Sequence, residues 1–323
     1  MSELTAAIAY LRSPLAIRAR CETVLEAGIA GTLAHFAVDL AALPAVVDNV
    51  AAREQLTARF GQMSRFSAEH VAQLNADLAD RTPDERARTW IDLITVSIVL
   101  DTDATDSFRA GLYSSVPEEP LRADASGLKG VRVEELAEQS KLARALGGAV
   151  AMAPRTFRYG RPGGLVDALR ANGNAVTAAA FLQVLLESLG PLWPDGATIS
   201  GINLGEVWRH PAAGGAGLSE GLVPFHRLAQ WLAYSLAEPL ETAGIEVQQL
   251  GALTALPGSS TDGILTELGV VTPKHKGVID DEMTVEWRAL SIALFDRVVD
   301  GVQKKLGKTP AQLPLASVLQ LLH

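Results

Sequence analysis

Apolar residues recur every three or four positions along most of the chain, which is the spacing of helices with one buried face. The clearest stripe predicts a long helix near the C-terminus and consists of Val285, Ile292, Phe295, Val299, Val302 and Leu306. An earlier stripe consists of Ile17, Cys21, Val24 and Leu25. Ser13 and Pro14 precede that stripe as an N-cap and a first-turn proline, and Gly28 is placed to end it.

A capping box predicts another helix early in the chain. Thr82 and Glu85 stand three residues apart, with Pro83 at the first helical position. The helix should end near Asp101, and its apolar positions should be buried. These positions are Trp90, Leu93, Ile94 and Ile98.

Further start and stop residues predict three more helices. They cover 133–152, 174–190 with Asn174 as the N-cap, and a segment that begins at Pro224. Pro239 must end or kink this last helix. Residues 198–203 are expected to be extended, and 101–130 and the glycine-rich stretch 214–221 to be loops. The pattern indicates a mainly α protein with minor short strands. We expect a single helical domain over 1–323, with a looser N-terminal part over about 1–130.

Composition narrows the class of protein. The chain has 323 residues, 48% of them apolar, and a net charge of 28 − 37 = −9. It can therefore bury a sizeable core, and its negative charge argues against non-specific binding of nucleic acid. No apolar run approaches the ~18 residues of a membrane span, and no basic stretch precedes an apolar run at the N-terminus. We expect a cytoplasmic protein that does not associate with membranes.

The chain contains none of the common short motifs for metal binding, for a nucleophilic serine or for dinucleotide binding. Cys21 is the single cysteine, so an internal disulfide or a multi-cysteine metal site is excluded. His-Glu-x-x-His, Gly-x-Ser-x-Gly and Gly-x-Gly-x-x-Gly are absent from the sequence. Since metal-ligand spacings are missing as well, the sequence predicts neither a metal nor a cofactor.

Three segments carry candidate chemistry, and each also has a purely structural interpretation. Asp101, Asp103 and Asp106 form an acidic cluster after a predicted helix. The cluster is either a solvated turn or the source of a substrate-binding carboxylate at Asp101. It lacks the central glycine and closing glutamate of a calcium loop.

The second segment is the predicted helix that follows Pro224. His226, Gln230 and Tyr234 stand four residues apart and share one face, with Trp231 on the neighbouring stripe. A polar and aromatic face of this kind suits a pocket for a flat polar ring, although a surface stripe beside a core histidine gives the same pattern. Trp208 and Arg209 stand shortly before this helix and join the candidate binding set.

The third segment, Glu286-Trp287-Arg288, opens the last long helix. The two charged residues can serve a site or form a surface ion pair beside a core tryptophan. Four of the five tryptophans fall between residues 193 and 287, which indicates that the C-terminal half is the functional half.

These segments resemble a known family. Residues 222–247 (Leu-Val-Pro-Phe-His-Arg-Leu-Ala-Gln-Trp-Leu-Ala-Tyr and onward to Val247) resemble the signature of the uracil-catabolism protein family, long known only as a domain of unknown function. Further matches are 205–211 (Gly-Glu-Val-Trp-Arg-His-Pro), 161–164 (Arg-Pro-Gly-Gly), 268–270 and 285–289, and also His35-Phe36. The resemblance covers nearly the whole chain and is most specific over about 131–323.

That family is in turn distantly similar to the queuosine-nucleotide glycosylases, which cleave an N-ribosidic bond within a helical fold. The resemblance implies a glycosylase-like helical fold and a nucleoside-like small-molecule substrate in pyrimidine breakdown. It also implies a carboxylate in a Glu-Tyr-Arg segment, but here Gly258, Ser259 and Ser260 occupy those positions. Substitute carboxylates are Asp101, Asp262 and Glu286.

Our first hypothesis is a divergent N-ribosidase-like hydrolase acting on a small ribosylated or heterocyclic nitrogen compound. Asp101 and Glu286 are its candidate catalytic acids. Its candidate binding residues are Trp208, Arg209, His226, Gln230, Trp231, Tyr234, Asp262 and Arg288. The alternatives are a non-catalytic binding protein or subunit that has lost the family carboxylate, and a pocket reused in specialised metabolism. A homo-oligomer is compatible with each of these hypotheses.

Overall fold

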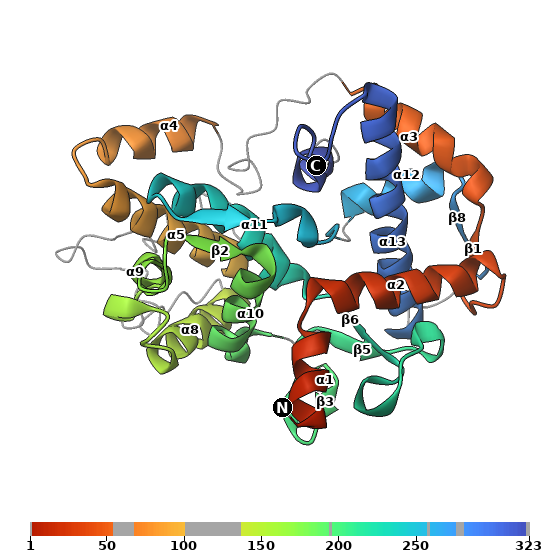
Figure 1. Cartoon of the computed structure of the whole chain (residues 1–323), viewed down its shortest axis with the longest axis horizontal. Coiled ribbons are helices and arrows are strands. Elements are labelled where there is room, and N and C mark those ends of the chain that lie inside the picture. The colour runs from red at the N-terminus through yellow and green to blue at the C-terminus, as the bar shows by residue number, and fades with distance from the viewer. Residues whose placement is uncertain are drawn as a thin grey trace. The chain divides into compact units, whose positions relative to one another are not determined.

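The computed structural model describes residues 2–53, 68–100, 137–193, 196–256, 259–275 and 281–320 (Figure 1). Its helices are α1 (Glu3–Leu11), α2 (Pro14–Ile29), α3 (Leu43–Ala51), α4 (Ala68–Asp77), α5 (Pro83–Leu100), α8 (Ala137–Met152), α9 (Leu165–Arg170), α10 (Ala178–Ser188), α11 (Arg227–Thr242), α12 (Ser259–Glu267), α13 (Asp281–Leu306) and α14 (Leu315–Gln320). The prediction of a mainly α protein is confirmed. Among these helices, none has both the length and the hydropathy that crossing a membrane requires.

The strands are short, and those described pair only in twos. They are β1 (Phe36–Val38), β2 (Ala175–Thr177), β3 (Thr198–Ile199), β4 (Ile202–Asn203), β5 (Val207–Arg209), β6 (Leu222–Pro224), β7 (Glu246–Gln248) and β8 (Val271–Pro273). The pairs β1–β8, β3–β4 and β5–β6 are antiparallel, and β2–β7 is parallel. The extended piece predicted over 198–203 is the β3–β4 hairpin.

The chain divides into two compact units. Unit 1 consists of Met1–Arg59, Pro194–Gln230 and Gly251–His323, and unit 2 of Phe60–Trp193 and Trp231–Leu250. The boundary therefore passes through α11 after its first turn. The expectation of a single domain stays a prediction.

Unit 1 is built around α13, which packs against α2 and α3. Its core contains the predicted apolar stripes of both long helices, including Ile17 and Val24 from α2 and Ile292 and Phe295 from α13. Ser13 caps α2 as predicted, since its hydroxyl oxygen accepts a hydrogen bond from the amide of Ala16. The sequence pattern therefore identifies the two helices that form the frame of this unit.

Gly28 has another role than the predicted helix stop. It is buried inside α2, where a Cβ would lie only 2.8 Å from Cγ2 of Val38. The helix continues to Ile29, and the left-handed turn falls on Gly31 (φ 75°). Gly28 is therefore a close-packing glycine, and the chain reverses three residues later.

The helix predicted to open at Pro224 begins later. Pro224 is the last residue of β6, and the amide of Phe225 donates to the carbonyl oxygen of Glu206. This pairing keeps the chain extended until His226, so α11 starts at Arg227. Pro239 lies inside α11, which continues to Thr242.

Asn174 does not cap the helix predicted after it. Its carbonyl oxygen accepts a hydrogen bond from the amide of Glu246 and so extends the β2–β7 pairing. The cap of α10 is Thr177, whose hydroxyl oxygen accepts from the amide of Ala180. The sequence pattern found this helix but missed the strand in front of it.

Unit 2 contains α5, which starts with the predicted cap: the Thr82 hydroxyl oxygen accepts from the amide of Glu85 at 3.2 Å. The apolar residues predicted to be buried in α5 are so, namely Leu93, Ile94 and Ile98. Trp90, which was expected to be buried with them, is only half-buried, and its indole N–H donates to the side-chain oxygen of Asn75.

The Arg161-Pro-Gly-Gly164 turn binds a buried carboxylate of α5. Asp92 accepts hydrogen bonds from Nε of Arg161 at 2.7 Å and from the amide of Gly163 at 2.6 Å. Burial nevertheless raises the pKa of Asp92 to about 6, because Arg161 and the Gly163 amide offset only part of the desolvation. The two glycines are required sterically: a Cβ on Gly163 or Gly164 would overlap the backbone of Arg88 or Arg158.

We therefore expect Gly164→Ala to destabilise the protein by at least ~2 kcal/mol, because the methyl group would displace backbone rather than a flexible side chain. The matched control is Gly148→Ala within α8, where a Cβ meets no atom within 4 Å. That control should stabilise the protein by about 0.5–1 kcal/mol. Urea unfolding of both variants measures the difference. Equal midpoints for the two would contradict this packing account.

Candidate functional site

Two buried carboxylates organise the part of unit 1 that carries the family motifs. Glu206 precedes β5 and is 8% exposed. Its Oε1 accepts from Nη1 of Arg288 at 3.0 Å, and its Oε2 accepts from the amide of Arg227 at 2.6 Å. Glu206 thus joins the N-terminal end of α11 to the first turns of α13. Burial outweighs these partners, so the pKa of Glu206 is raised.

The second carboxylate belongs to Glu286, which is fully buried in α13. Its Oε1 accepts from the amide of Ala34, and its Oε2 from the amide of His35, each at 3.0 Å. Burial raises the pKa of Glu286, but the nearby His210 imidazole and the two amides outweigh burial and bring the pKa below its ordinary value. Glu286 is therefore ionised at neutral pH.

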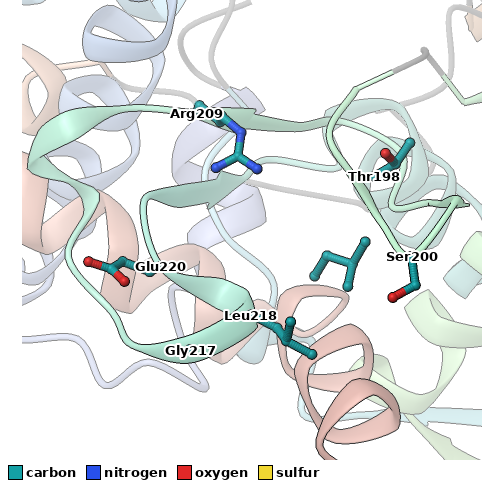
Figure 2. Close-up of a pocket in the computed structure, with 7 residues that line it drawn as sticks. Thr198, Ser200, Arg209, Gly217, Leu218 and Glu220 are labelled. Carbon is teal, nitrogen blue, oxygen red and sulfur yellow. The ribbon is translucent and has the colours of Figure 1, made fainter.

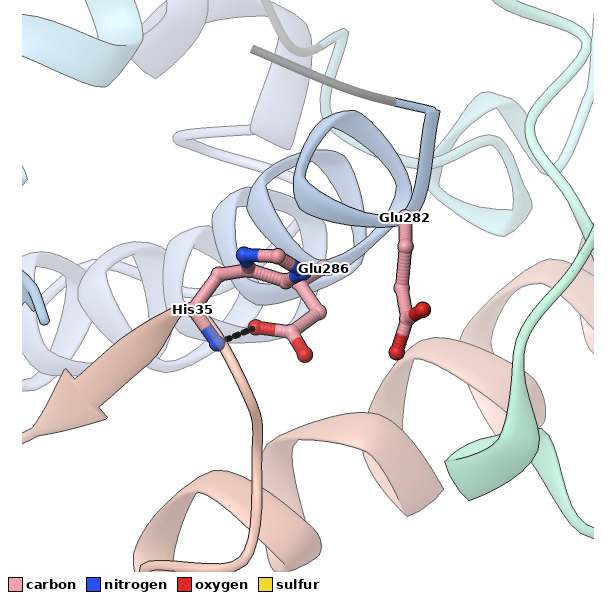
Figure 3. Close-up of side chains that lie close together, drawn as sticks. All are labelled: His35, Glu282 and Glu286. Atoms are coloured by element: carbon pink, nitrogen blue, oxygen red, sulfur yellow. Dashed lines mark hydrogen bonds between the residues drawn. The ribbon is translucent and has the colours of Figure 1, made fainter. Parts of the chain in front are cut away.

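Glu286 is also part of a cluster of charged and imidazole groups. One ligand atom each from His35, Glu282 and Glu286 lies within 4.8 Å of the others. Figure 3 shows the two carboxylates side by side below the start of α13, with His35 on the segment that leads into β1. Among the described residues, this is the group of three histidine, cysteine or acidic side chains whose ligand atoms lie close enough together to hold a metal ion.

His226 and Gln230 lie at the start of α11 and are buried. The Nε2 atom of His226 lies 2.9 Å from the carbonyl oxygen of Leu11, and the Gln230 amide group bonds both the hydroxyl and the amide of Thr254. His226 has φ 48°, a left-handed conformation that is uncommon outside glycine. Both side chains thus tie α11 to neighbouring segments of unit 1.

The alternation of side chains along β5 sends Trp208 and Arg209 to opposite faces. Trp208 packs against the core of unit 1. The Arg209 side chain is exposed and makes no hydrogen bond or ion pair with any residue that the structure describes. Its guanidinium is therefore available to a ligand.

Arg209 lies in a surface pocket of about 480 Å³. Figure 2 shows its guanidinium directed toward the pocket, with the Glu220 carboxylate on one side and the hydroxyls of Thr198 and Ser200 on the other. The other lining residues are Ile199, Gly217 and Leu218. A guanidinium, a carboxylate and two hydroxyls in an open pocket suit a small polar ligand that bears several hydroxyl groups.

The structure distributes the predicted site residues over several places. Glu286 and Arg288 lie at the start of α13, Trp208 and Arg209 on β5, and His226 and Gln230 at the start of α11, all in unit 1. Trp231 is half-buried and Tyr234 is buried, and both belong to unit 2. Asp101, Gly258 and the side chain of Asp262 lie outside the described residues. That these groups form one site stays a prediction.

The sequence reasoning overlooked Glu206, His210, His35 and Glu282 as individual residues. Glu206 and His210 stand inside the family motif at 205–211. Their polar side chains within that motif could have marked them as candidates. Glu282 and Glu286 stand four apart, which places them on one face of a helix. No spacing relates His35 to α13, because the contact arises only through the tertiary fold.

The sequence profile of a family described as "Protein of unknown function (DUF1688)" matches residues 10–109 and 105–321. This chain belongs to that family. The family assignment made from the motifs is thereby confirmed, and the more distant similarity to the glycosylases stays a prediction.

Two curated proteins are similar to this DUF1688 chain. Protein urg3 of Schizosaccharomyces pombe is 26% identical over 371 aligned positions, which cover 98% of this chain and 92% of that protein. Uracil catabolism protein 4 of Lachancea kluyveri is 32% identical over 219 positions, which cover 57% of this chain and 49% of that protein.

The buried His226 of this DUF1688 protein predicts a pH dependence of stability. Burial lowers the pKa of His226 to about 4, so the folded state holds the neutral imidazole while the unfolded chain takes up a proton near pH 6.5. The free energy of unfolding should therefore fall as the pH drops from about 6.5 toward 4, by about 1.4 kcal/mol per pH unit from this group.

The comparison with His226→Asn isolates this contribution, because asparagine tolerates the left-handed conformation and does not titrate. Urea unfolding of both proteins between pH 4 and pH 7 should give a shallower slope for the variant. Identical slopes would mean that His226 is protonated as readily in the folded protein as in the unfolded chain.

Proposed function

We propose that this protein acts in uracil catabolism as a divergent N-ribosidase-like hydrolase of a small ribosylated or heterocyclic nitrogen compound. The observation that carries the proposal is the 32% identity with a protein named Uracil catabolism protein 4. The family motifs also persist in this chain, as 205–211, 222–247 and 285–289. Likeness of sequence supports the pathway more strongly than the reaction type.

The pocket at Arg209 supports the class of ligand. A ribosyl group presents hydroxyls, and a sugar phosphate adds an anion. The guanidinium of Arg209 can donate to either, and Thr198, Ser200 and Glu220 can bond further hydroxyls. The volume of about 480 Å³ is within the usual range for small-molecule sites.

Hydrolysis of an N-ribosidic bond makes a defined demand on the protein. The bond between the anomeric carbon and nitrogen breaks, the oxygen of water bonds to that carbon, and a proton reaches the departing nitrogen. A carboxylate stabilises the positive charge that develops on the sugar or activates the water. Among the described carboxylates Glu286 is held ionised, and Asp101 and Asp262 are the other candidates.

Burial of Glu286 favours a second candidate function, a binding protein without turnover. Both oxygens of its carboxylate already accept backbone hydrogen bonds, and Gly258 replaces the carboxylate that the family resemblance leads one to expect. Such a protein would bind the same ligand in the same pocket and release it unchanged.

Incubating the purified chain with ribosylated urea, uridine and its 5′-phosphate tests both candidates. We expect equal amounts of free sugar and released nitrogen compound, measured by NMR. Binding by calorimetry without product would favour the binding protein. Neither binding nor product with any of the three compounds would overturn both candidates.

Arg209→Ala should raise KM by about 10- to 100-fold and change kcat much less, because a charged hydrogen bond to the ground state is lost. Arg155→Ala, at an exposed position of unit 2, is the matched control and should leave KM unchanged. An unchanged KM in Arg209→Ala would remove this pocket from the account.

A further inference from the structure

Near the start of α13, Glu286, a candidate carboxylate of the proposed reaction, lies beside two groups that this reaction does not use, His35 and Glu282. His35 offers a ring nitrogen, and Glu282 and Glu286 each offer a carboxylate oxygen, with the three atoms within 4.8 Å of one another (Figure 3). We propose that these three residues bind a divalent first-row transition metal of the zinc class. This inference does not depend on the proposed ribosidase reaction.

The separations require only a small adjustment. Ligand atoms around a tetrahedral zinc ion lie about 3.4 Å apart, since each is about 2.1 Å from the metal. Glu282 and Glu286 stand four apart on α13, so both carboxylates already emerge on one side of the helix. The Glu282 side chain is 45% exposed, so it is free to rotate toward the other two ligand atoms.

The fold holds the Glu286 carboxylate in place before any metal arrives, and it places the His35 backbone directly beside that carboxylate. The amide of His35 donates to Oε2 of Glu286, and the amide of Ala34 donates to Oε1. Each oxygen of Glu286 retains a lone pair for a metal. Hydrogen bonds that orient ligating carboxylates in this way are typical of protein metal sites.

His210 provides an independent indication of a ligand. Its side chain is 1% exposed and points into the cluster, with Nε2 3.4 Å from Oε1 of Glu286 and 4.0 Å from Oε1 of Glu282. Neither contact has the geometry of a hydrogen bond, so Nε2 has only these long carboxylate contacts among the residues that the structure describes. An imidazole nitrogen is seldom left in that state when buried.

The tautomer of His210 defines its role. Its Nδ1 accepts a hydrogen bond from the amide of Ala212, so the proton of the neutral ring is on Nε2. Nε2 cannot then ligate a metal, but it can donate to a metal-bound water or to a ligating carboxylate. His210 is therefore assigned as a positioning residue outside the ligand set.

The donor types favour a transition metal over magnesium or calcium. Mg²⁺ and Ca²⁺ prefer oxygen-only surroundings with six or more ligands, whereas imidazole suits zinc and its neighbours. Three protein ligands also leave a position for water, as in catalytic zinc sites. No spacing along the chain indicates this metal site, since His35 is separated from the two glutamates by more than two hundred residues.

Calorimetry on the full chain, with its affinity tag removed and after dialysis against a chelator, tests the proposal. We expect Zn²⁺ to bind with a stoichiometry of one and to raise the melting temperature, and Mg²⁺ at the same concentration to do neither. Co²⁺ should bind and produce visible absorption bands, a readout that is independent of activity.

Variants separate the ligands from their surroundings. Glu282→Gln and His35→Ala should each weaken Zn²⁺ binding by at least 10-fold, whereas Glu267→Gln, on the exposed part of α12, should not. His210→Ala should weaken binding by 10- to 100-fold, and His210→Gln, which keeps a donor near the position of Nε2, should restore most of it. Circular dichroism confirms that each variant is folded.

The proposal is overturned if the wild-type chain binds neither Zn²⁺ nor Co²⁺. It is equally overturned if Glu282→Gln and His35→Ala, both folded, bind Zn²⁺ as tightly as the wild type. Turnover of a ribosylated compound by metal-free protein would leave the metal site standing, so failure of one proposal is distinguishable from failure of the other.

Discussion

Two buried carboxylate side chains, Glu206 and Glu286, determine how the motif-bearing segments of unit 1 are arranged. An unpaired carboxylate in such a position would cost several kcal/mol, so each must be satisfied by donors in fixed places. Glu206 is satisfied by Arg288 and by the first amide of α11, and Glu286 by the amides of Ala34 and His35. The beginnings of α11 and α13, β5 and the segment before β1 are therefore held together by polar groups rather than by apolar contact alone.

This constraint explains why the family motifs contain polar residues that face no solvent. Glu206 and His210 flank β5, and each contributes a group to the buried arrangement. The strand between them turns Arg209 outward into the pocket, because side chains alternate along a strand. The same short motif therefore supplies both the support and an exposed candidate binding group.

Periodicity predicted the frame of the molecule well. The apolar stripes of α2 and α13 and the caps at Ser13 and Thr82 follow from local rules of helix formation, so the sequence alone reveals them. Boundaries failed where long-range pairing decided them, as at Pro224, which β5 keeps in a strand, and at Asn174, whose carbonyl oxygen accepts from the amide of Glu246, the first residue of β7. The helix or strand propensity of a short segment does not reveal hydrogen-bond partners that are distant in the sequence.

The candidate site could be predicted only in part. Arg209, Glu286 and Arg288 were selected from the motifs, and family membership is confirmed. The approach of His35 and His210 to α13 could not be seen, because it depends on which segments the folded chain brings together. Residues such as His226 and Gln230 appeared equally suited to a site or to the core, and the structure places their polar atoms in hydrogen bonds with neighbouring segments.

Native-state hydrogen exchange of the His35 and Arg227 amides tests most directly whether the buried carboxylates hold this region together. If they do, both amides should exchange only through large-scale opening, with protection close to that of the α13 core. Exchange at the rate of exposed loops for either amide would contradict the account, since a proton bonded to a buried carboxylate cannot reach water while that bond persists.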